Sequence, residues 1–251
     1  MTQHLYILTG ASRGLGLAMA EQLLSGNHFV LCISRNTNAA LASRAARLDT
    51  KLEQWPLDLE HTVEAAAMLG QWLSNRKTGM FTGATLINNA GVLPRIGPLS
   101  ASDPIDLSRA LRVGLEAPLL LTAAFLRVTD PWGIPRKVLN ISSGLGRRAL
   151  AAQAGYCAVK AGMDHFTRCL ALDEALKPNG AKVCSLAPGV IDTDMQLQLR
   201  HADASAFPDQ KNFIDLKVNG QLASPVETAS HVRAYLARPD FGRDPIGDVR
   251  D

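Results

Sequence analysis

Three side chains near the middle of the chain have the types and the spacing of a proton-transfer site. Ser143 ends the apolar run "KVLNISS", Tyr156 follows thirteen residues later, and Lys160 stands four residues beyond the tyrosine. Residues four apart share one face of a helix, so the ammonium of Lys160 would lie beside the phenol of Tyr156. A nearby positive charge favours the phenolate and lowers a pKa that is ordinarily about 10. Tyr156 could then exchange a proton with a carbonyl oxygen that the hydroxyl of Ser143 holds.

A glycine-rich turn follows the first apolar run. The segment "TGASRGLG" at 9–16 joins the strand-like "LYIL" to a helical segment. Glycines let the chain turn tightly and approach a pyrophosphate closely, while the N-terminus of the next helix faces the phosphates. The spacing differs from the commoner G-x-G-x-x-G fingerprint, and the alternative interpretation is a plain tight turn. We expect a dinucleotide to bind here, on Gly10, Ser12, Arg13, Gly14, Leu15 and Gly16.

The end of the second apolar run predicts which nicotinamide cofactor binds. An acidic residue at this place would hydrogen-bond a ribose 2′-hydroxyl, but the chain has "SRN" at 34–36. The guanidinium groups of Arg35 and Arg13 could instead pair with a 2′-phosphate through charge-assisted bonds. We therefore expect NADP(H) rather than NAD(H), the alternative being two solvated arginines. Beside a nicotinamide, Tyr156 and Lys160 are better explained as a proton-transfer pair than as an ordinary surface pair on a helix.

Apolar runs and amphipathic segments alternate along the chain. Six runs rich in Val, Ile and Leu alternate with segments of helical periodicity at 15–26, 38–49, 61–76, 103–128, 156–177 and 224–236. This pattern, with strands that are apolar throughout, is typical of an α/β fold whose parallel sheet is covered on both faces. We expect a single domain over 1–251, a doubly wound Rossmann-type parallel sheet with helices on both faces. The polar, irregular stretch 192–223 is expected to form a substrate lid, with an apolar inner face made by Met195, Leu197, Leu199 and Phe207.

Composition and charge exclude several other classes of protein. The chain has 251 residues, of which 47% are hydrophobic, and a net charge of +3. Basic residues are scattered, so no nucleic-acid surface is expected, and no apolar stretch has the length of a membrane span. The first residues lack the pattern of a signal peptide, and the four cysteines show no metal-ligand spacing. We expect a cytoplasmic protein with reduced thiols and no metal, acting on a small molecule.

The motifs together resemble the short-chain dehydrogenase/reductase family. The matching segments follow the family's order and are "TGASRGLG", "LDL" at 57–59, "NNAG" at 88–91, "NISSG" at 140–144, "YCAVK" at 156–160 and "APGVIDTDM" at 187–195. Further segments, "APLLLT" at 117–122 and the ending "GDVRD", are similar to the benzil reductase and sepiapterin reductase branch. That branch reduces vicinal dicarbonyl compounds, so the resemblance implies a substrate of this class.

The resemblance also implies roles for individual residues. Tyr156 would be the general acid or base, Lys160 would lower its pKa and hold the cofactor ribose, and Ser143 would orient the substrate. Other residues would lie beside the adenine, along the cofactor groove and over the nicotinamide, namely Asp58, Leu59, Asn89, Ala90, Gly91, Pro188, Gly189, Val190, Ile191 and Thr193. By the same analogy, a homodimer or homotetramer would form through the helices at 103–128 and 156–177.

The chain departs from the family pattern at Gly114. Many members carry a catalytic asparagine eight residues before a threonine, and counting back from Thr122 gives Gly114. In the family, the backbone carbonyl of that asparagine also holds a water that connects the lysine to solvent. Pro118 lacks the N–H that would bond the carbonyl of Gly114, so we expect a kinked helix whose free oxygen still holds this water. The alternative is a simple kink with weakened or lost catalysis.

Three functions remain open from the sequence. The first is an NADPH-dependent carbonyl reductase that acts on small dicarbonyl or aromatic ketone substrates. A 3-oxoacyl thioester reductase is the alternative enzyme, although the ending "GDVRD" lacks the Gly-Gly close common in that branch. A non-catalytic NADP-binding sensor is favoured only by Gly114.

Two further pairs of charged residues lie near these motifs. Arg147 and Arg148 could steer an acidic substrate or be solvated. Asp192 and Asp194 are expected to cap a helix or form a turn.

Overall fold

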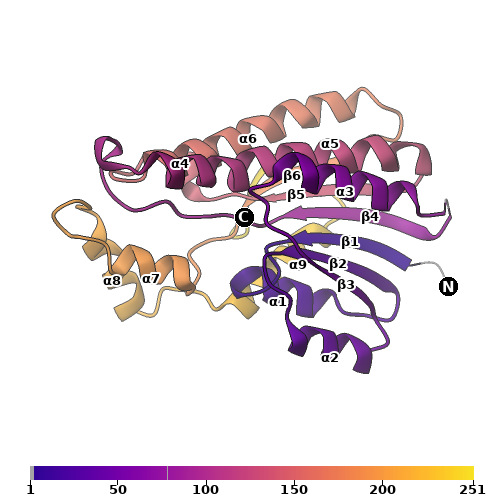
Figure 1. The fold of residues 1–251 in the computed structure, drawn as a ribbon, viewed down its shortest axis with the longest axis horizontal. Helices are drawn as coiled ribbons and strands as arrows, with labels where there is room; N and C mark the ends of the chain where they lie inside the picture. The colour runs from indigo at the N-terminus through magenta and orange to yellow at the C-terminus, as the bar shows by residue number, and fades with distance from the viewer. Residues whose placement is uncertain (1–2, 78) are drawn as a thin grey trace.

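The protein is built around one parallel sheet (Figure 1). The computed structural model describes residues 3–77 and 79–251. Within these residues, seven strands pair in the order β3-β2-β1-β4-β5-β6-β7, and every pair is parallel. The strands are β1 Gln3–Thr9, β2 His28–Ser34, β3 Lys51–Pro56, β4 Phe81–Asn88, β5 Arg136–Ile141, β6 Lys182–Ala187 and β7 Ile246–Asp248.

Helices connect the strands and cover both faces of the sheet. They are α1 Gly14–Leu23, α2 Ala39–Arg47, α3 Thr62–Ser74, α4 Pro104–Leu111, α5 Ala117–Thr129, α6 Ala154–Ala175, α7 Asp194–Arg200, α8 Gln210–Val218 and α9 Pro225–Ala237. In Figure 1, α3, α4, α5 and α6 lie on one side of the sheet, while α1, α2 and α9 lie on the other. The order of the first six strands is that of the dinucleotide-binding fold. The expected doubly wound, Rossmann-type α/β fold is therefore confirmed.

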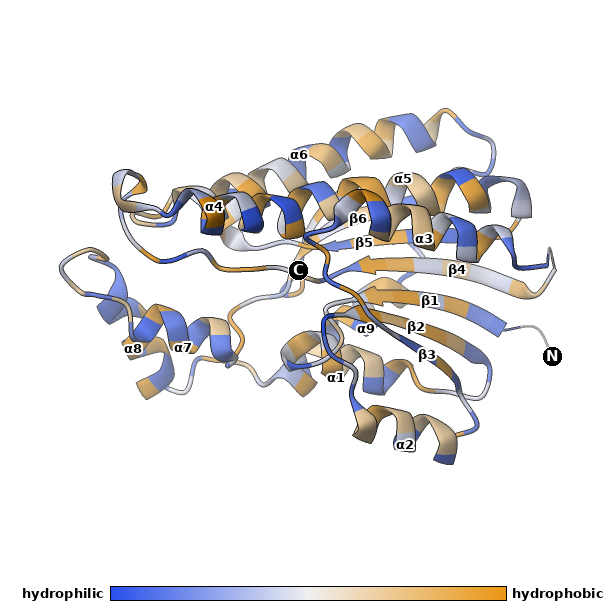
Figure 2. Cartoon of the chain, viewed as in Figure 1, coloured by the Kyte–Doolittle hydropathy of each residue, from blue (hydrophilic) through white to orange (hydrophobic). Residues whose placement is uncertain are grey.

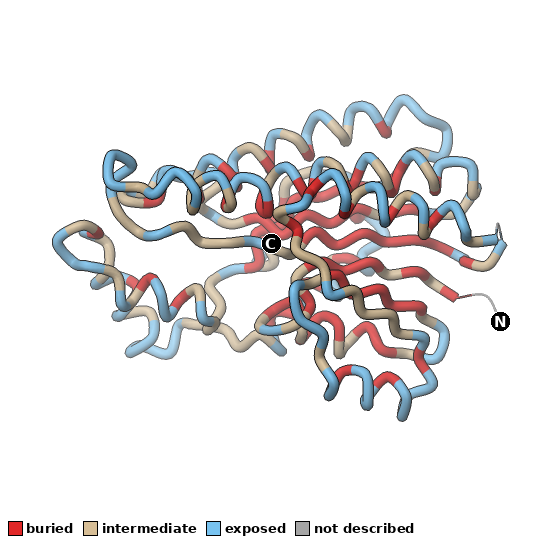
Figure 3. Tube along the Cα trace, viewed as in Figure 1, coloured by how far each residue is buried: buried red, intermediate tan, exposed pale blue. Residues whose placement is uncertain are grey.

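Two apolar layers, one on each face of the sheet, hold the fold together. Leu8 belongs to the layer that joins the sheet to α1 and α9. Its neighbours Leu5 and Ile7 belong to the other layer, where Leu69 of α3 and Phe125 of α5 are fully buried. Strand side chains alternate between faces, so β1 supplies both layers. Figures 2 and 3 show the result, a hydrophobic and buried sheet beneath helices whose outer faces are exposed.

Local features differ from the expectations drawn from sequence. The predicted helix at 103–128 is divided into α4 and α5 by a π-helical turn, Arg112–Glu116. The stretch 192–223, expected to be irregular, contains the short helices α7 and α8. The strand β7 was not predicted, because three residues are too few to show a period. Short 3₁₀ turns occur at Leu99–Ala101, Asp130–Trp132 and Gly144–Gly146.

The carboxyl ends of the central strands bring the sequence motifs together. Because the strands are parallel, β1, β4, β5 and β6 all end at the same edge of the sheet. These ends carry the glycine turn, "NNAG", "NISSG" and "APG" respectively. The direction in which successive strands are added reverses between β1 and β4. Ligands of open α/β sheets bind beyond the carboxyl ends of the strands at such a switch point.

Candidate active site

A cavity of about 800 Å³ opens beyond the carboxyl ends of the strands. Pockets for small molecules and cofactors usually measure about 300–1,000 Å³. All the residues predicted to be catalytic or to bind the cofactor line this cavity, namely Gly10, Ser12, Arg13, Gly14, Leu15, Gly16, Arg35, Asp58, Leu59, Asn89, Ala90, Gly91, Ser143, Tyr156, Lys160, Pro188, Gly189, Val190, Ile191 and Thr193. The structure therefore assembles these dispersed segments in one place, while the role of each residue stays a prediction.

The glycine turn leaves no room for side chains where it meets β4. Gly10 has a φ of +71°, and a Cβ atom at this position would lie 2.9 Å from the Cα of Ala90. A Cβ atom on Gly16 would lie 2.0 Å from the carbonyl oxygen of Gly10. Asn89 fixes the turn, because its Nδ2 donates to the carbonyls of Thr9 at 3.0 Å and Gly10 at 3.2 Å. The tight turn and the unpaired first N–H groups of α1 fit a pyrophosphate cradle.

The two arginines expected at a 2′-phosphate have different surroundings. Arg35 is exposed at the end of β2. Arg13 forms an ion pair with Asp194, the first residue of α7, with 2.6 Å between Nη1 and Oδ2. Asp192 pairs instead with Lys217, at 2.5 Å. Both aspartates thus form ion pairs at the N-terminus of α7. The negative charge of Asp194 also interacts favourably with the positive end of the helix dipole.

Tyr156 and Ser143 face the cavity from α6 and from the end of β5. The Oγ of Ser143 accepts a hydrogen bond from the N–H of Leu145 at 3.2 Å, which caps the 3₁₀ turn after the strand. Burial raises the pKa of Tyr156 to about 12, and a hydrogen bond with Ser143 opposes this rise. The expected low pKa of Tyr156 is therefore wrong. A phenol that keeps its proton at neutral pH is the form required to donate a proton to a carbonyl oxygen.

Lys160 is buried and directed toward the end of β5. Its Nζ donates to the carbonyl of Ile141 at 2.8 Å and lies 5.7 Å from the centroid of the Tyr156 ring. Burial lowers the pKa of Lys160 to about 8, and the negative charge of Asp164 opposes this fall. The ammonium is thus close enough to stabilise a phenolate formed when Tyr156 gives up its proton, although it does not depress the resting pKa.

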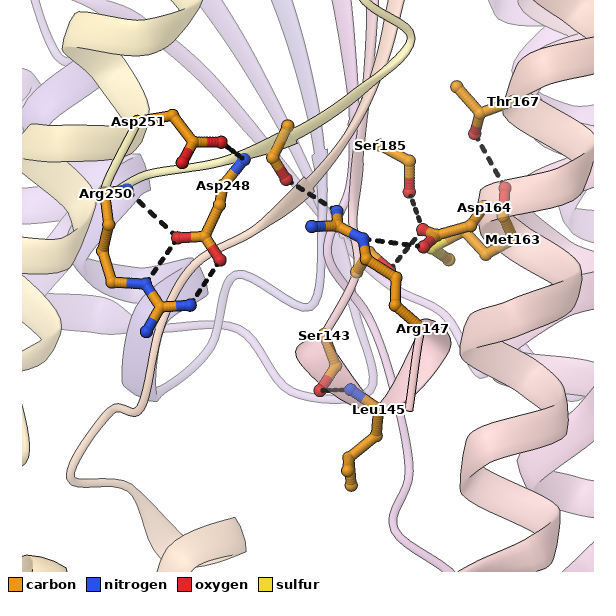
Figure 4. A network of polar contacts seen from close by, with 12 residues as sticks. Ser143, Leu145, Arg147, Met163, Asp164, Thr167, Ser185, Asp248, Arg250 and Asp251 are labelled. Carbon is orange, nitrogen blue, oxygen red and sulfur yellow. Dashed lines mark hydrogen bonds and ion pairs between the residues drawn. The ribbon is translucent and has the colours of Figure 1, made fainter. Parts of the chain in front are cut away.

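A buried carboxylate joins the two central strand ends to α6 (Figure 4). Asp164 lies one turn after Lys160 and is 1% exposed. Its Oδ1 accepts hydrogen bonds from the Oγ atoms of Ser142 at 2.5 Å and Ser185 at 2.7 Å, and its Oδ2 pairs with Arg147 at 3.3 Å. Arg147 was expected either to steer an acidic substrate or to be solvated. Its guanidinium instead pairs with Asp164. Sequence reasoning missed Asp164, although an acid four residues after the lysine was a readable signal.

The region of Gly114 explains the departure from the family pattern. Gly114 lies in the π-helical turn, where the N–H of Ala117 donates to the carbonyl of Arg112, and Pro118 is the second residue of α5. The regular α-helical pattern thus changes at the expected place, while a kink and a relay water at the Gly114 carbonyl stay predictions. A Cβ atom at Gly114 would lie 2.6 Å from the Cγ1 of Val159. Val159 thus occupies the space that an asparagine would need.

The segment at 192–223 contributes an apolar wall. Leu199, Phe207 and Phe213 form a buried cluster, in which the two phenylalanine rings stack with centroids 5.5 Å apart. Met195, Leu199 and Phe213 also line the cavity. Leu197 is 44% exposed, so its assignment to the inner face is wrong. Residues 195 and 199 share one face of α7, whereas 197 points away from it.

Other kinds of site find no support in the described part of the chain. Among residues 3–77 and 79–251, no group of three or more side chains could hold a metal ion. Cys32, Cys157, Cys169 and Cys184 are all free thiols. None of the helices described is long and apolar enough to cross a membrane.

Comparison with known proteins agrees with this geometry. The benzil reductase ((S)-benzoin forming) of Bacillus cereus is 35% identical over 243 residues, covering 97% of this chain and 96% of the relative. The sepiapterin reductase of Bos taurus is 29% identical and covers 94% and 91% of the two chains. The crystal structure of a short-chain dehydrogenase/reductase from Burkholderia vietnamiensis is 35% identical, covers 99% of both chains and superposes with a TM-score of 0.65.

A family profile settles the classification. The profile described as short chain dehydrogenase matches residues 4–204, which contain the glycine turn and the Ser143, Tyr156 and Lys160 positions. Members of this family are oxidoreductases that use nicotinamide cofactors, and the structure offers such a cofactor the glycine turn and the cavity described above. This chain belongs to the short-chain dehydrogenase/reductase family.

Proposed function

We propose that this protein is an NADPH-dependent carbonyl reductase, which reduces small benzil-like dicarbonyls or aromatic ketones to hydroxy compounds. The observation that carries the proposal is the common cavity of Ser143, Tyr156 and Lys160 with the glycine turn. Benzil reductases match nearly the whole chain, which supports the dicarbonyl substrate class. The apolar wall formed by Leu199 and Phe213 suits an aromatic substituent.

In the proposed reaction, the chain's own groups bind the carbonyl and supply a proton. The bound cofactor supplies the hydride. Ser143 orients the carbonyl oxygen, and the protonated Tyr156 donates its proton to that oxygen as negative charge develops there. The positive charge of Lys160 then stabilises the phenolate. Burial of Tyr156 and Lys160 keeps water away from these two groups and strengthens the electrostatic interaction between them.

The choice of NADPH depends on positive charge at the end of β2 and in the glycine turn. Arg35 lies where an acidic residue would favour NADH, and Arg13 lines the same cavity. Charge-assisted bonds from these two side chains would bind a 2′-phosphate. The remaining predicted residues, from Asp58 to Thr193, would contact the adenine, ribose and nicotinamide.

The proposal also covers the domain organisation, the oligomeric state and the cellular location of the protein. We propose a single catalytic domain, with the segment at 192–223 as substrate lid, that works in the cytoplasm as a homodimer or homotetramer. Large apolar side chains on α4, on α6 and at the C-cap of α6 support assembly, because Ile105 is 79% exposed, Leu172 is 72% exposed and Leu176 is 87% exposed. Light scattering should therefore give a mass of two or four chains.

One assay tests the activity. Purified protein is mixed with NADPH and benzil or 1-phenyl-1,2-propanedione, and the loss of NADPH absorbance is followed. We expect turnover by the unchanged protein and none by Tyr156→Phe, which keeps the ring but has no proton to give. Cofactor binding without turnover across a broad carbonyl panel would contradict the reductase and favour a sensor.

A second enzyme function is kept because one relative supports it. The 3-oxoacyl-[acyl-carrier-protein] reductase FabG of Aquifex aeolicus is 30% identical over 233 residues. An acetoacetyl thioester added to the same assay separates the two activities. A higher kcat/KM for the thioester than for the diketone would replace the proposed substrate class.

A further inference from the structure

A buried glutamine in the wall of the cavity has no hydrogen-bond partner for its side chain. Gln153 stands at the N-cap of α6, is 2% exposed and lines the cavity. Within the described chain, neither its Nε2 nor its Oε1 has a partner, and the amide does not cap the helix. Native proteins pair the great majority of their buried polar atoms, so an amide left unpaired at both atoms points to a ligand.

The backbone around this glutamine is unusual as well. Ala152, immediately before it, has a φ of +62°, the left-handed conformation that residues other than glycine rarely adopt. The carbonyl of Ala152 accepts a hydrogen bond from the N–H of Gly97 at 3.1 Å, which holds this conformation in place. Strain of this kind persists where surrounding contacts enforce it, and it concentrates at ligand sites. The loop thus fixes Gln153 at the edge of the cavity.

Gln153 is also close to the proposed reacting groups. Gln153 and Tyr156 are three residues apart at the start of α6, and such residues are neighbours on a helix surface. Both line the cavity together with Ser143. When Tyr156 and Ser143 hold the reacting carbonyl oxygen of a substrate, the next carbon atom of that substrate should therefore lie within reach of the Gln153 side chain.

We propose that Gln153 is a specificity-determining residue, whose Nε2 donates a hydrogen bond to the non-reacting oxygen of a vicinal dicarbonyl. This inference rests on the proposed reductase function and selects, within it, 1,2-dicarbonyl compounds over simple aromatic ketones. A simple ketone occupies the cavity but leaves the amide unpaired. Sites built to hydrogen-bond a polar group discriminate strongly against analogues that lack it, because their own buried groups then lose their partner.

The test compares one diketone with the two ketones that it contains. Wild type and Gln153→Met are assayed with NADPH and 1-phenyl-1,2-propanedione, propiophenone or phenylacetone, each ketone lacking one of the two oxygens. Methionine keeps the length and unbranched shape of glutamine without its donor. We expect kcat/KM for the diketone to fall about 10- to 100-fold, the range for one lost hydrogen bond to a ligand, and that for both ketones to change less than about threefold. Gln71→Met, on the exposed face of α3, is the matched control and should behave as wild type.

Unfolding in urea supplies a readout that does not depend on activity. An amide without partners does not stabilise the free protein, so the urea midpoint of Gln153→Met should equal or exceed that of wild type. A lower midpoint would show a structural partner for Gln153 and overturn the inference. Equal losses of kcat/KM for the diketone and the ketones, or no loss for any, would also overturn it while leaving the reductase function intact. Absence of turnover by wild type on all three compounds would refute the proposed function, and the inference with it.

Discussion

The close contact between Gly114 and Val159 predicts that these two positions are energetically coupled. In Gly114→Ala, the new methyl group would lie 2.6 Å from the Cγ1 of Val159, whereas carbon atoms in contact are ordinarily about 3.5–4.0 Å apart. One of the two helices must therefore move by about 1 Å. Val159 is 2% exposed and precedes Lys160 directly, so a displacement at Val159 also moves the lysine.

The magnitude follows from three separate contributions. Overpacking costs about 1–3 kcal/mol, and the better helix propensity of alanine returns about 1 kcal/mol, so Gly114→Ala should lose about 0–2 kcal/mol of unfolding free energy. Val159→Ala removes two buried methyl groups and should lose about 1.5–2.5 kcal/mol. In the double variant the new methyl fills part of the vacated space, and we expect a loss of only about 1 kcal/mol.

Urea unfolding of the four proteins measures this coupling as a double-mutant cycle. The expected coupling energy is about 2 kcal/mol in favour of the double variant, within the range found for residues in contact. NADPH turnover should fall in Gly114→Ala and recover in the double variant, because the position of Lys160 is restored. Losses of free energy that add to within about 0.5 kcal/mol would refute the claim that Val159 fills the space of the missing side chain.

Three further predictions concern charged groups at the cavity. Because the pKa of Lys160 is about 8, its protonated form is lost as pH rises through this value, and kcat/KM for reduction should fall above about pH 8. Asp164 raises the pKa of Lys160, so Asp164→Asn should move this fall to lower pH in a pH–rate profile; an unmoved profile would contradict the assigned interaction. Arg35→Ala should raise KM for NADPH about 10- to 100-fold, the range for a lost charge-assisted bond, and leave KM for NADH nearly unchanged. Equal changes in KM for NADPH and NADH would show that Arg35 does not bind the 2′-phosphate.

Much of the fold could be predicted because its signals are local. The strand β5 is apolar throughout, and the glycine turn stands between a strand and a helix, so both elements are readable from short windows of sequence. The gathering of Ser143, Tyr156 and Lys160 in one cavity follows from the parallel arrangement of strand ends. The exact bounds of α6, which begins at Ala154 rather than at 156, depend on a cap whose residue, Gln153, is an unusual one.

The features that sequence reasoning missed depend on contacts between distant segments. The resting pKa of Tyr156 is set by burial, and neither burial nor the direction of the Lys160 side chain can be read from a four-residue spacing. Leu197 was misplaced because the rotation of α7 about its axis is determined by packing against other segments. The unpaired amide of Gln153 is visible only when all possible partners have been located in space.

The end of β5 has a consequence for how the proposed catalytic groups move. Three consecutive residues there perform different tasks: the carbonyl of Ile141 holds Lys160, the hydroxyl of Ser142 is bound to Asp164, and Ser143 faces the cavity. Peptide geometry fixes the spacing between these three residues, so any fluctuation of the strand carries the lysine anchor and the substrate-facing hydroxyl in the same direction. A displacement of this strand end would therefore move the anchor of Lys160 and the Ser143 hydroxyl together.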